Sequence, residues 1–201
     1  MADTRTLLLD AAAEEFARHG LPGARVQAIV QRAGVNERMI YHHFGSKEAL
    51  YAAVLQAHLA DLAAAWRPAI ARASSMPPYE GMRLALAAMV TELWRRPLTV
   101  GLWLHEAMAG WGALPVPAAE ALPAPLRELY ERGQREGRFR GDCSFEIAYV
   151  TALGAVMSLV IGAPRLAGVL TDRLDDGDGA ALRDQVVSQL LDGMTGPVAP
   201  Q

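Results

Sequence analysis

The sequence has little of several features on which whole classes of protein depend. Its one cysteine, Cys143, can form no internal disulfide and no thiolate metal site of its own. Its formal net charge of -3 argues against a protein that coats nucleic acid nonspecifically, although a local basic surface stays possible. No segment alternates apolar and polar residues over a useful length, so strands are not predicted. The cysteine usage is typical of a reducing compartment, and we expect a cytoplasmic protein.

Long hydrophobic segments are also scarce. Near the N-terminus the only dense apolar run is Leu7–Leu9, which is too short for a secretory signal. Ile147–Ala163 carries no charge, but it falls short of the about 20 residues that cross a bilayer, and Gly154 and Gly162 lie within it. We therefore expect a buried helix at this segment and no membrane association.

What the sequence does have is an abundance of helix-forming residues. The chain of 201 residues is 52% hydrophobic, enough to bury a sizeable core, and its apolar residues recur at helical spacing. This indicates an all-α fold. Helices are predicted over residues 4–19, 25–33, 36–43, 47–71, 79–95, 97–110, 126–136, 144–163 and 180–194. Breaks are predicted at 74–78 and in the proline-rich segment 113–125, and the tail 196–201 is expected to be disordered.

The second and third of these helices have the spacing of a helix-turn-helix. Ala33-Gly34-Val35 forms the turn, and Asn36 and Ser46 are expected to cap the third and fourth helices. The motif covers about residues 25–44 of an N-terminal three-helix domain, 1–48. The residues predicted to hold its helices together are Val26, Ile29, Val35 and Ile40.

The stretch "GVNERMIYHHFGSK" contains two adjacent histidines between aromatic residues. A metal site, a proton shuttle and a nucleic-acid surface would each give this composition. Neighbours on a helix point about 100° apart, so His42 and His43 are poorly placed to share an ion. The window from Arg25 to Lys47 has four basic side chains and one acidic one, which favours contact with nucleic acid.

Together, "RTLLLDAAAEEFARHG" and "VQAIVQRAGVNERMIYHHFGSKEALY" resemble the TetR family of transcriptional regulators. The resemblance covers about residues 5–55. It rests on Phe16, Gly20, Ile29, Ala33-Gly34-Val35, Tyr41, Phe44 and Lys47. It implies a DNA-binding module that dimerises, with an all-helical ligand-binding and dimerisation domain over 49–195.

The resemblance also implies roles for individual residues. Asn36, Glu37, Arg38 and Met39 match the base-reading positions of the recognition helix. Tyr41 and Lys47 match residues that hold the DNA backbone. Arg25 can reach phosphate, and His42 and His43 are expected to contact DNA at the end of the helix, the alternative being that at least one of them packs inward. The alternative for Glu37 and Arg38 is a solvated charge.

Two departures from the family pattern stand out. The family often begins the second helix with a threonine that caps it, where this chain has Ala24-Arg25. The small residues usual in the recognition helix are replaced by Arg38 and Met39, so the operator sequence cannot be taken from a relative.

Catalytic and metal motifs are incomplete. "HEAMA" at His105–Ala109 begins like a zinc-protease motif but lacks the second histidine. Cys143 has no local catalytic partner, and no glycine-rich phosphate loop occurs. We expect no enzyme activity, no cofactor and no metal.

Tryptophans gather in the middle of the chain, together with methionines and two polar residues. They form either plain core or an apolar cavity for a largely apolar small-molecule effector. The predicted lining residues are Trp66, Met89, Trp94, Trp103, His105, Glu106, Met108 and Trp111.

Small residues repeat every four positions along 144–163, where they allow close approach of another helix. With the last helix they predict a four-helix dimer interface, the alternative being packing within one chain. The predicted interface residues are Gly154, Ser158, Gly162, Leu182, Val186 and Leu190.

We therefore expect a homodimeric repressor that binds a palindromic operator in double-stranded DNA. A small-molecule effector is expected to release it, and the fourth helix is expected to transmit the change from the ligand site to the DNA-binding domain. An activator of the same family is the near alternative. A small helical ligand carrier or enzyme is the distant one.

Overall fold

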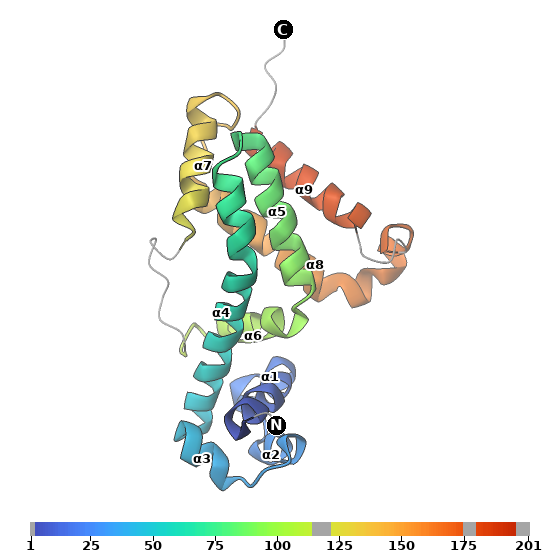
Figure 1. The fold of residues 1–201 in the computed structure, drawn as a ribbon. Helices are drawn as coiled ribbons and strands as arrows, with labels where there is room; N and C mark the ends of the chain where they lie inside the picture. The colour runs from blue at the N-terminus through green and yellow to red at the C-terminus, as the bar shows by residue number, and fades with distance from the viewer. Residues whose placement is uncertain (1–2, 114–121, 175–179, 196–201) are drawn as a thin grey trace. The chain divides into compact units, whose positions relative to one another are not determined.

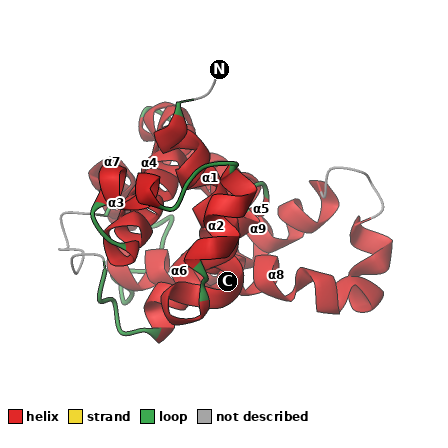
Figure 2. Ribbon diagram, turned by 90° about the horizontal axis from the view of Figure 1, so that it is seen from below, coloured by secondary structure: helices red, strands yellow, loops and turns green. Residues whose placement is uncertain are grey.

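The computed structural model describes residues 3–113, 122–174 and 180–195, and over 167–174 it describes the backbone alone. These residues form helices joined by loops and contain no strand, which confirms the all-α prediction (Figure 1, Figure 2). Most of the proline-rich segment and the whole tail predicted above lie outside the described residues. The chain divides into two compact units: unit 1 is Met1–Leu62 with Arg96–Val116, and unit 2 is Ala63–Arg95 with Pro117–Gln201.

Unit 1 contains α1 (Thr4–Gly23), α2 (Val26–Ala33), α3 (Arg38–Phe44), α6 (Pro97–Met108) and the first part of α4 (Lys47–Ser74). Its core forms because apolar residues of α1 recur at helical spacing and face the other helices. Leu8, Phe16, Ile29, Ile40 and Leu102 are almost completely buried there. The division of the chain differs from a boundary at residue 48, because α6 packs against α1 and belongs to unit 1.

Helix α1 changes direction at Gly20, whose φ of 62° lies in the left-handed region. This is where the sequence predicts the end of the helix, and one further turn follows at 21–23. A side chain at residue 20 would be strained and would also meet His105 of α6, whose Nδ1 lies 2.9 Å from the position of an added Cβ. The glycine therefore permits the close approach of α1 and α6.

Unit 2 contains α5 (Pro78–Trp94), α7 (Ala124–Arg135), α8 (Phe145–Leu174), α9 (Ala180–Thr195) and the remainder of α4. Buried Trp66 of α4 donates its indole N–H to the carbonyl of Ala85 in α5 at 2.9 Å. Tyr130 of α7 stacks on Phe139 with ring centroids 5.1 Å apart. The packing is close, because a Cβ added to Gly133 would overlap the Phe139 ring.

Helix α8 is longer than the predicted 144–163, and it continues through Pro164. Its Phe145–Leu166 segment has a mean hydropathy of 1.8 and is long and apolar enough to cross a membrane. Only 22% of it is buried in the single chain, so the prediction of a buried helix is wrong for this segment. Several of its large apolar side chains are instead exposed on one face of unit 2.

Candidate nucleic-acid interface

The turn between α2 and α3 depends on one glycine. Gly34 has φ 67° and ψ 30°, the left-handed conformation that ends α2, and the Val35 N–H donates to the carbonyl of Val30 at 3.1 Å. The four predicted packing residues do pack here: Ile29 and Ile40 are buried, and Val26 and Val35 are partly buried against the same core. The angle between the two helices is thus fixed by a core that both share.

Side-chain caps begin the next two helices, as the sequence predicts. Asn36 accepts a hydrogen bond at its Oδ1 from the Arg38 N–H at 2.9 Å. Ser46 accepts at its Oγ from the Ala49 N–H at 3.0 Å. Both are short polar side chains at positions where the first turn of a helix has unpaired N–H groups. Local hydrogen bonds therefore set where α3 and α4 begin.

Glu15 replaces the missing threonine cap at the start of α2. Its side chain is buried, and its Oε1 accepts a hydrogen bond from the Arg25 N–H at 3.1 Å. The other oxygen of Glu15 lies 3.8 Å from the Arg32 guanidinium, which also donates to the carbonyl of Ala11 at 3.3 Å. A buried carboxylate of α1 thus joins both ends of α2 to α1.

Sequence reasoning did not identify Glu15 as a structural residue, although a signal was present. It follows Leu8 by seven residues and Ala11 by four, so helical spacing alone places it on the buried face of α1. Arg5 was also missed: its guanidinium carbon lies 5.3 Å from the centre of the Phe44 ring, which fastens the end of α3 to α1.

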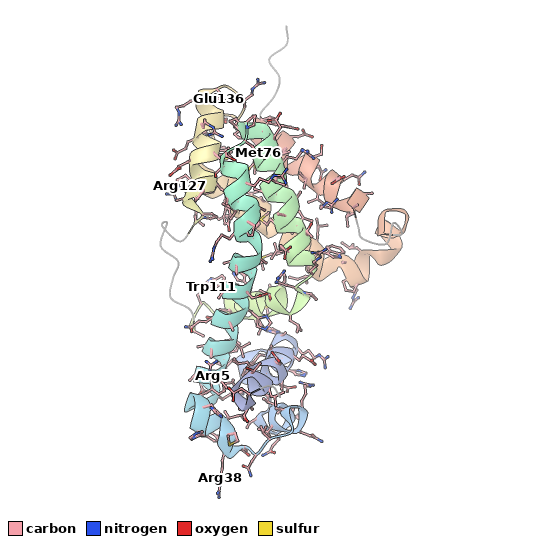
Figure 3. The ribbon with its side chains drawn as sticks, in the orientation of Figure 1. Arg5, Arg38, Met76, Trp111, Arg127 and Glu136 are labelled. Atoms are coloured by element: carbon pink, nitrogen blue, oxygen red, sulfur yellow. The ribbon has the colours of Figure 1, made fainter. Side chains whose placement is uncertain are left out.

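Two of the predicted base-reading side chains are open to solvent in unit 1. Asn36 and Arg38 are exposed, and Figure 3 shows Arg38 projecting outward from the start of α3. Glu37 is half-buried, and its carboxylate already has partners, since it accepts from Gln27 Nε2 at 2.5 Å and from the Tyr41 hydroxyl at 3.4 Å. Arg38 is thus the base-reading candidate with the freest side chain.

Met39 differs from the expectation that it reads bases, because it is partly buried against the core of unit 1. The two histidines also differ from each other. His42 is exposed, whereas His43 is half-buried with its Nε2 shielded from solvent. Their rings meet edge to face with centroids 5.0 Å apart. His42 is therefore available to a partner, and His43 is the one turned inward.

The remaining predicted contacts surround α3. Tyr41 is half exposed and Arg25 is exposed. Lys47 is the first residue of α4, a helix of 28 residues, where free N–H groups and the helix dipole favour an anion. Lys47 is also the only lysine in the chain. Cationic, phenolic and imidazole groups thus border the outward face of the recognition helix.

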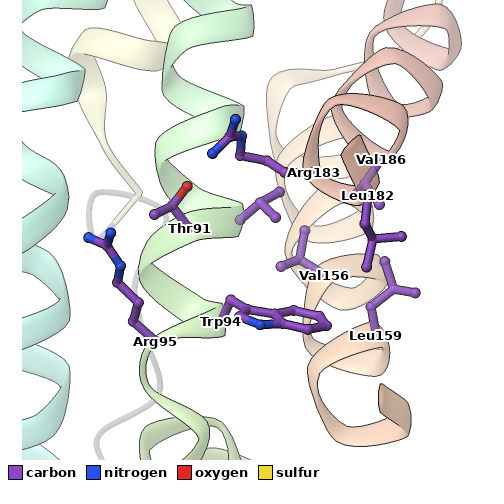
Figure 4. Close-up of a pocket in the computed structure, with 9 residues that line it drawn as sticks. Thr91, Trp94, Arg95, Val156, Leu159, Leu182, Arg183 and Val186 are labelled. Atoms are coloured by element: carbon purple, nitrogen blue, oxygen red, sulfur yellow. The ribbon is translucent and has the colours of Figure 1, made fainter. Parts of the chain in front are cut away.

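The residues predicted to line an effector cavity do not share one cavity. Trp66 and Met89 belong to the packed core of unit 2, around a void of about 10 Å³. Trp94 lies in a cavity of about 90 Å³ between α5, α8 and α9 (Figure 4). Trp103 and Trp111 pair with each other in unit 1, with ring centroids 4.8 Å apart. The predicted lining residues are close in sequence, but they lie at different sites in the structure.

The last three predicted lining residues, His105, Glu106 and Met108, border a cavity of about 650 Å³ within unit 1. Glu106 is buried, and its carboxylate accepts from the Ala113 N–H at 2.6 Å. Burial and the neighbouring Glu106 carboxylate raise the pKa of Tyr51, on the same cavity, to about 12. The polar side chains that line this cavity are those of His19, Glu48, Tyr51, His105 and Glu106.

The predicted interface residues also separate into two sets. Gly154 and Ser158 of α8 are exposed, and an added Cβ at Gly154 would meet nothing within 4 Å. Leu182 and Val186 of α9 are instead buried within unit 2, where they line the cavity of Figure 4. That part of the prediction is wrong, because both faces of α9 carry apolar residues and the sequence does not show which one faces inward. Gly162 and Leu190 are half-buried.

A metal centre is not evident: in residues 3–113, 122–174 and 180–195 no group of three or more histidine, cysteine, aspartate or glutamate side chains could hold an ion. The structure instead presents a capped helix-turn-helix whose second helix carries exposed polar and cationic side chains. This arrangement defines the class of helix-turn-helix DNA-binding proteins.

Comparison with known proteins gives the family. The sequence model of the family described as "Bacterial regulatory proteins, tetR family" matches residues 8–54. The transcriptional repressor NicS of Pseudomonas putida is 33% identical over 153 residues, 73% of this chain and 71% of NicS. The transcriptional repressor KstR2 of Rhodococcus jostii is 31% identical over 153 residues, 72% of each chain. The chain belongs to the TetR family and is a DNA-binding transcription regulator.

Two further similarities bear on fold and on function. The crystal structure of the putative transcriptional regulator SCO4942 from Streptomyces coelicolor superposes with a TM-score of 0.72 at 25% identity, covering 97% of this chain and 100% of that one. The transcriptional activator FasR of Mycolicibacterium smegmatis is 43% identical, but over 68 residues only, 34% of this chain and 31% of FasR. FasR is thus similar to this chain over a much shorter segment than NicS and KstR2 are.

Proposed function

We propose that the protein is a transcriptional repressor that binds a palindromic operator as a homodimer and is released by a small-molecule effector. The observation that carries the proposal is the outward face of α3, where Arg38, Tyr41 and His42 are exposed next to Lys47. A repressor is favoured over an activator because NicS and KstR2, which match over more than two thirds of their length, are both repressors. Acting on chromosomal DNA places the protein in the cytoplasm.

Each group has a distinct role on DNA. Arg38 can donate two parallel hydrogen bonds to O6 and N7 of guanine, a contact that discriminates between bases by about 1–3 kcal/mol. Tyr41 and Lys47 hold phosphates, the phenol as a donor and the lysine as a point charge at the start of α4. Arg25 adds a further phosphate contact. The Tyr41 hydroxyl, whose one proton is donated to Glu37 at 3.4 Å in the free chain, donates it to a phosphate oxygen instead when DNA is bound.

The dimer is proposed to form on the exposed face of α8. Ile147, Val150 and Ile161 are 63%, 59% and 43% exposed in the single chain. With Gly154 and Ser158 they follow intervals of three and four residues, which is one face of a helix. Exposed apolar residues in one stripe are typical of a helix that packs against a second copy, and the two small residues allow close approach.

The dimer sets the geometry of DNA recognition. Two recognition helices that enter successive major grooves must be about 34–36 Å apart, and the two-fold symmetry of the homodimer makes the operator palindromic. An effector that binds better to a dimer with a different spacing would release the DNA, and its effect is limited by that difference in affinity. Helix α4, which begins at Lys47 in unit 1 and continues into unit 2, is the element that can transmit the change.

Binding to the intergenic DNA upstream of the protein's own gene tests the proposal. Fluorescence anisotropy at low salt should show binding that competitor DNA of random sequence does not abolish, and the Tyr41→Phe, Lys47→Ala double variant should lose it. The matched control is Tyr79→Phe with Arg138→Ala, which removes an exposed phenol and an exposed cation of unit 2. If the control weakened binding as much as the test variant, or if the natural protein bound no upstream DNA, the proposal would be wrong.

A further inference from the structure

The cavity of about 90 Å³ in unit 2 has walls of two different kinds. Its apolar walls come from all three surrounding helices: Val90 of α5, Val156 and Leu159 of α8, and Leu182 and Val186 of α9. The remaining lining residues are Thr91, Trp94, Arg95 and Arg183. Figure 4 shows the Trp94 ring reaching across from α5 toward α8. A ligand would thus have hydrocarbon on several sides and polar groups in a limited region.

The charged residues that line this cavity are both arginines. In Figure 4 the Arg183 side chain extends from α9 toward Thr91 on α5. The Arg183 side chain is 29% exposed, and its Nε contacts Asp184 at 3.3 Å, a carboxylate that is itself 70% exposed. A guanidinium has five N–H donors, so one contact to Asp184 leaves the terminal nitrogens for a second anion.

Arg95 and Thr91 contribute less than Arg183. The Arg95 side chain is 71% exposed and lies 3.8 Å from Glu92, so solvent screens its charge. Thr91 already donates its hydroxyl proton to the carbonyl of Ala87 at 2.8 Å, which leaves its oxygen as an acceptor. The cavity therefore offers one well-placed cationic donor, Arg183, with a second cation at its edge.

The size of the cavity limits the ligand. A dry cavity of roughly 150 Å³ holds the six carbons of benzene, so a space of about 90 Å³ encloses only about three or four carbons of a narrow chain, and the rest of the ligand lies at the rim beside Arg183. The arginine fork matches a carboxylate, which can accept two parallel hydrogen bonds. An ammonium group would be repelled, and a hydroxyl group would satisfy only one donor.

We infer that this cavity is the effector site and that it binds a short-chain aliphatic carboxylate. The hydrocarbon chain lies against Val156, Leu182 and Val186, and the carboxylate is held by Arg183. The effector role rests on the proposed function, whereas the binding chemistry rests on the cavity alone. The larger cavity of unit 1 is a poorer site for an anion, because Glu48 and Glu106 line it together with two histidines, His19 and His105, and among the described residues its lining includes no arginine or lysine.

Hexanoate is a suitable probe, and Trp94 is a reporter already in place. The chain has four tryptophans, so protein labelled with ¹⁵N-tryptophan gives four indole N–H resonances, and the Trp94→Phe variant identifies the one from Trp94. Titration with hexanoate at constant ionic strength should shift the Trp94 resonance to saturation. Hexanol should bind at least about tenfold more weakly, and hexylammonium should give no saturable shift.

Substitutions at the rim separate the proposed contact from nonspecific effects. Arg183→Gln should weaken hexanoate about tenfold or more while leaving hexanol unchanged. The matched control is Arg138→Gln, which removes an exposed arginine of unit 2 that does not line the cavity and should bind hexanoate normally. Equal affinity for hexanoate and hexanol, or an unaltered affinity in Arg183→Gln, would overturn the inference. A shift confined to Trp103 and Trp111 would overturn it in favour of the cavity in unit 1.

DNA binding measured on the same samples distinguishes failure of the proposed effector site from failure of the proposed repressor function. Saturating hexanoate should weaken binding to the upstream DNA in the natural protein but not in Arg183→Gln. If hexanoate shifted Trp94 without changing the DNA affinity, the cavity would not be the effector site. If the protein bound no upstream DNA at all, the proposed function would fail whatever the Trp94 resonance did.

Discussion

The helix-turn-helix of unit 1 and the helices of unit 2 are built in different ways. Around the recognition helix α3 the starts of the helices are set by contacts between residues close in sequence, such as the Asn36 cap of α3 and the Ser46 cap of α4. In unit 2 the contacts join distant segments: α5 packs on α7, α8 and α9, and Trp66 bonds to Ala85. The first is a locally specified surface, and the second is a core that only the complete fold defines.

This difference has a functional side. The surface of α3 must present the same groups each time it meets DNA, and short-range caps keep it fixed. Unit 2 contains a cavity lined by three helices and an exposed apolar stripe on α8, so its packing is incomplete in the single chain. A regulator needs both: a part that does not change, and a part whose packing a ligand or a second copy can complete.

The largest expected effect comes from breaking the stripe on α8. Gly154→Arg places a charge where an added Cβ meets nothing within 4 Å, so the single chain should fold normally. The dimer should dissociate, and the affinity for a palindromic operator should fall by about 10²–10⁴, because the second half-site no longer binds at high effective concentration. Light scattering after size exclusion, together with DNA anisotropy, measures both quantities.

The control for that variant is Gly141→Arg, on a loop of unit 2 where an added Cβ also has open space. It should stay dimeric and bind DNA normally. A Gly154→Arg protein that remained a dimer would place the interface elsewhere.

The next effect concerns the packing of unit 2 itself. Gly133→Ala puts a methyl group against the Phe139 ring, 2.5 Å from its Cε2 atom, and near Pro78 at 3.0 Å. The free energy of unfolding should fall by about 1–3 kcal/mol, as expected for overpacking. Denaturant unfolding measures it, with Gly141→Ala as control. Below its melting temperature the variant should still have the natural salt dependence of DNA binding.

An effect of similar size distinguishes base recognition by Arg38 from phosphate contact by Lys47. Arg38→Ala should cost about 1–3 kcal/mol on the natural operator and should relax the preference at one base pair. Lys47→Ala should instead weaken binding to all sequences alike and reduce the slope of log K against log salt by about 1, because one phosphate is no longer neutralised. Equal reductions in affinity on operator and random DNA for Arg38→Ala would show that this arginine holds phosphate.

The smallest effect is a pH dependence in unit 1. His58 of α4 hydrogen-bonds Thr99 of α6 at 3.0 Å, and burial lowers the pKa of its imidazole, against the raising effect of Asp61 and Asp10. The unfolded chain therefore takes up a proton at a higher pH than the folded chain. Stability should be full above about pH 6.5 and should decrease as the pH falls below it.

Unfolding free energies measured between pH 7.5 and 5.5 test this. His58→Gln should reduce the slope, whereas His42→Gln, at an exposed histidine, should leave it unchanged. If the unfolding free energy of His58→Gln depended more steeply on pH than that of the natural protein, the assignment of the pH dependence to His58 would be wrong.

The sequence predicts the contacts between neighbouring residues well and the contacts between distant segments poorly. The caps and the turn glycine were predicted because each signal lies within a few residues of the group it serves, as with Asn36 and the Arg38 N–H. Leu182 and Val186 were misplaced because their helix is apolar on more than one face. The place of α6 in unit 1 was also missed, since it depends on α1 and on the close approach at Gly20.

Lys47 has one more consequence, which concerns covalent chemistry. It carries the only lysine ε-amine in the chain, at the first residue of α4 beside the recognition helix. An amine-directed reagent that modifies side chains therefore has a single target, and that target lies at the proposed phosphate contact. Bound DNA should shield it, so the extent of reductive methylation at Lys47 itself would report operator occupancy, and acetylation there would remove that side chain's charge without modifying any other side chain.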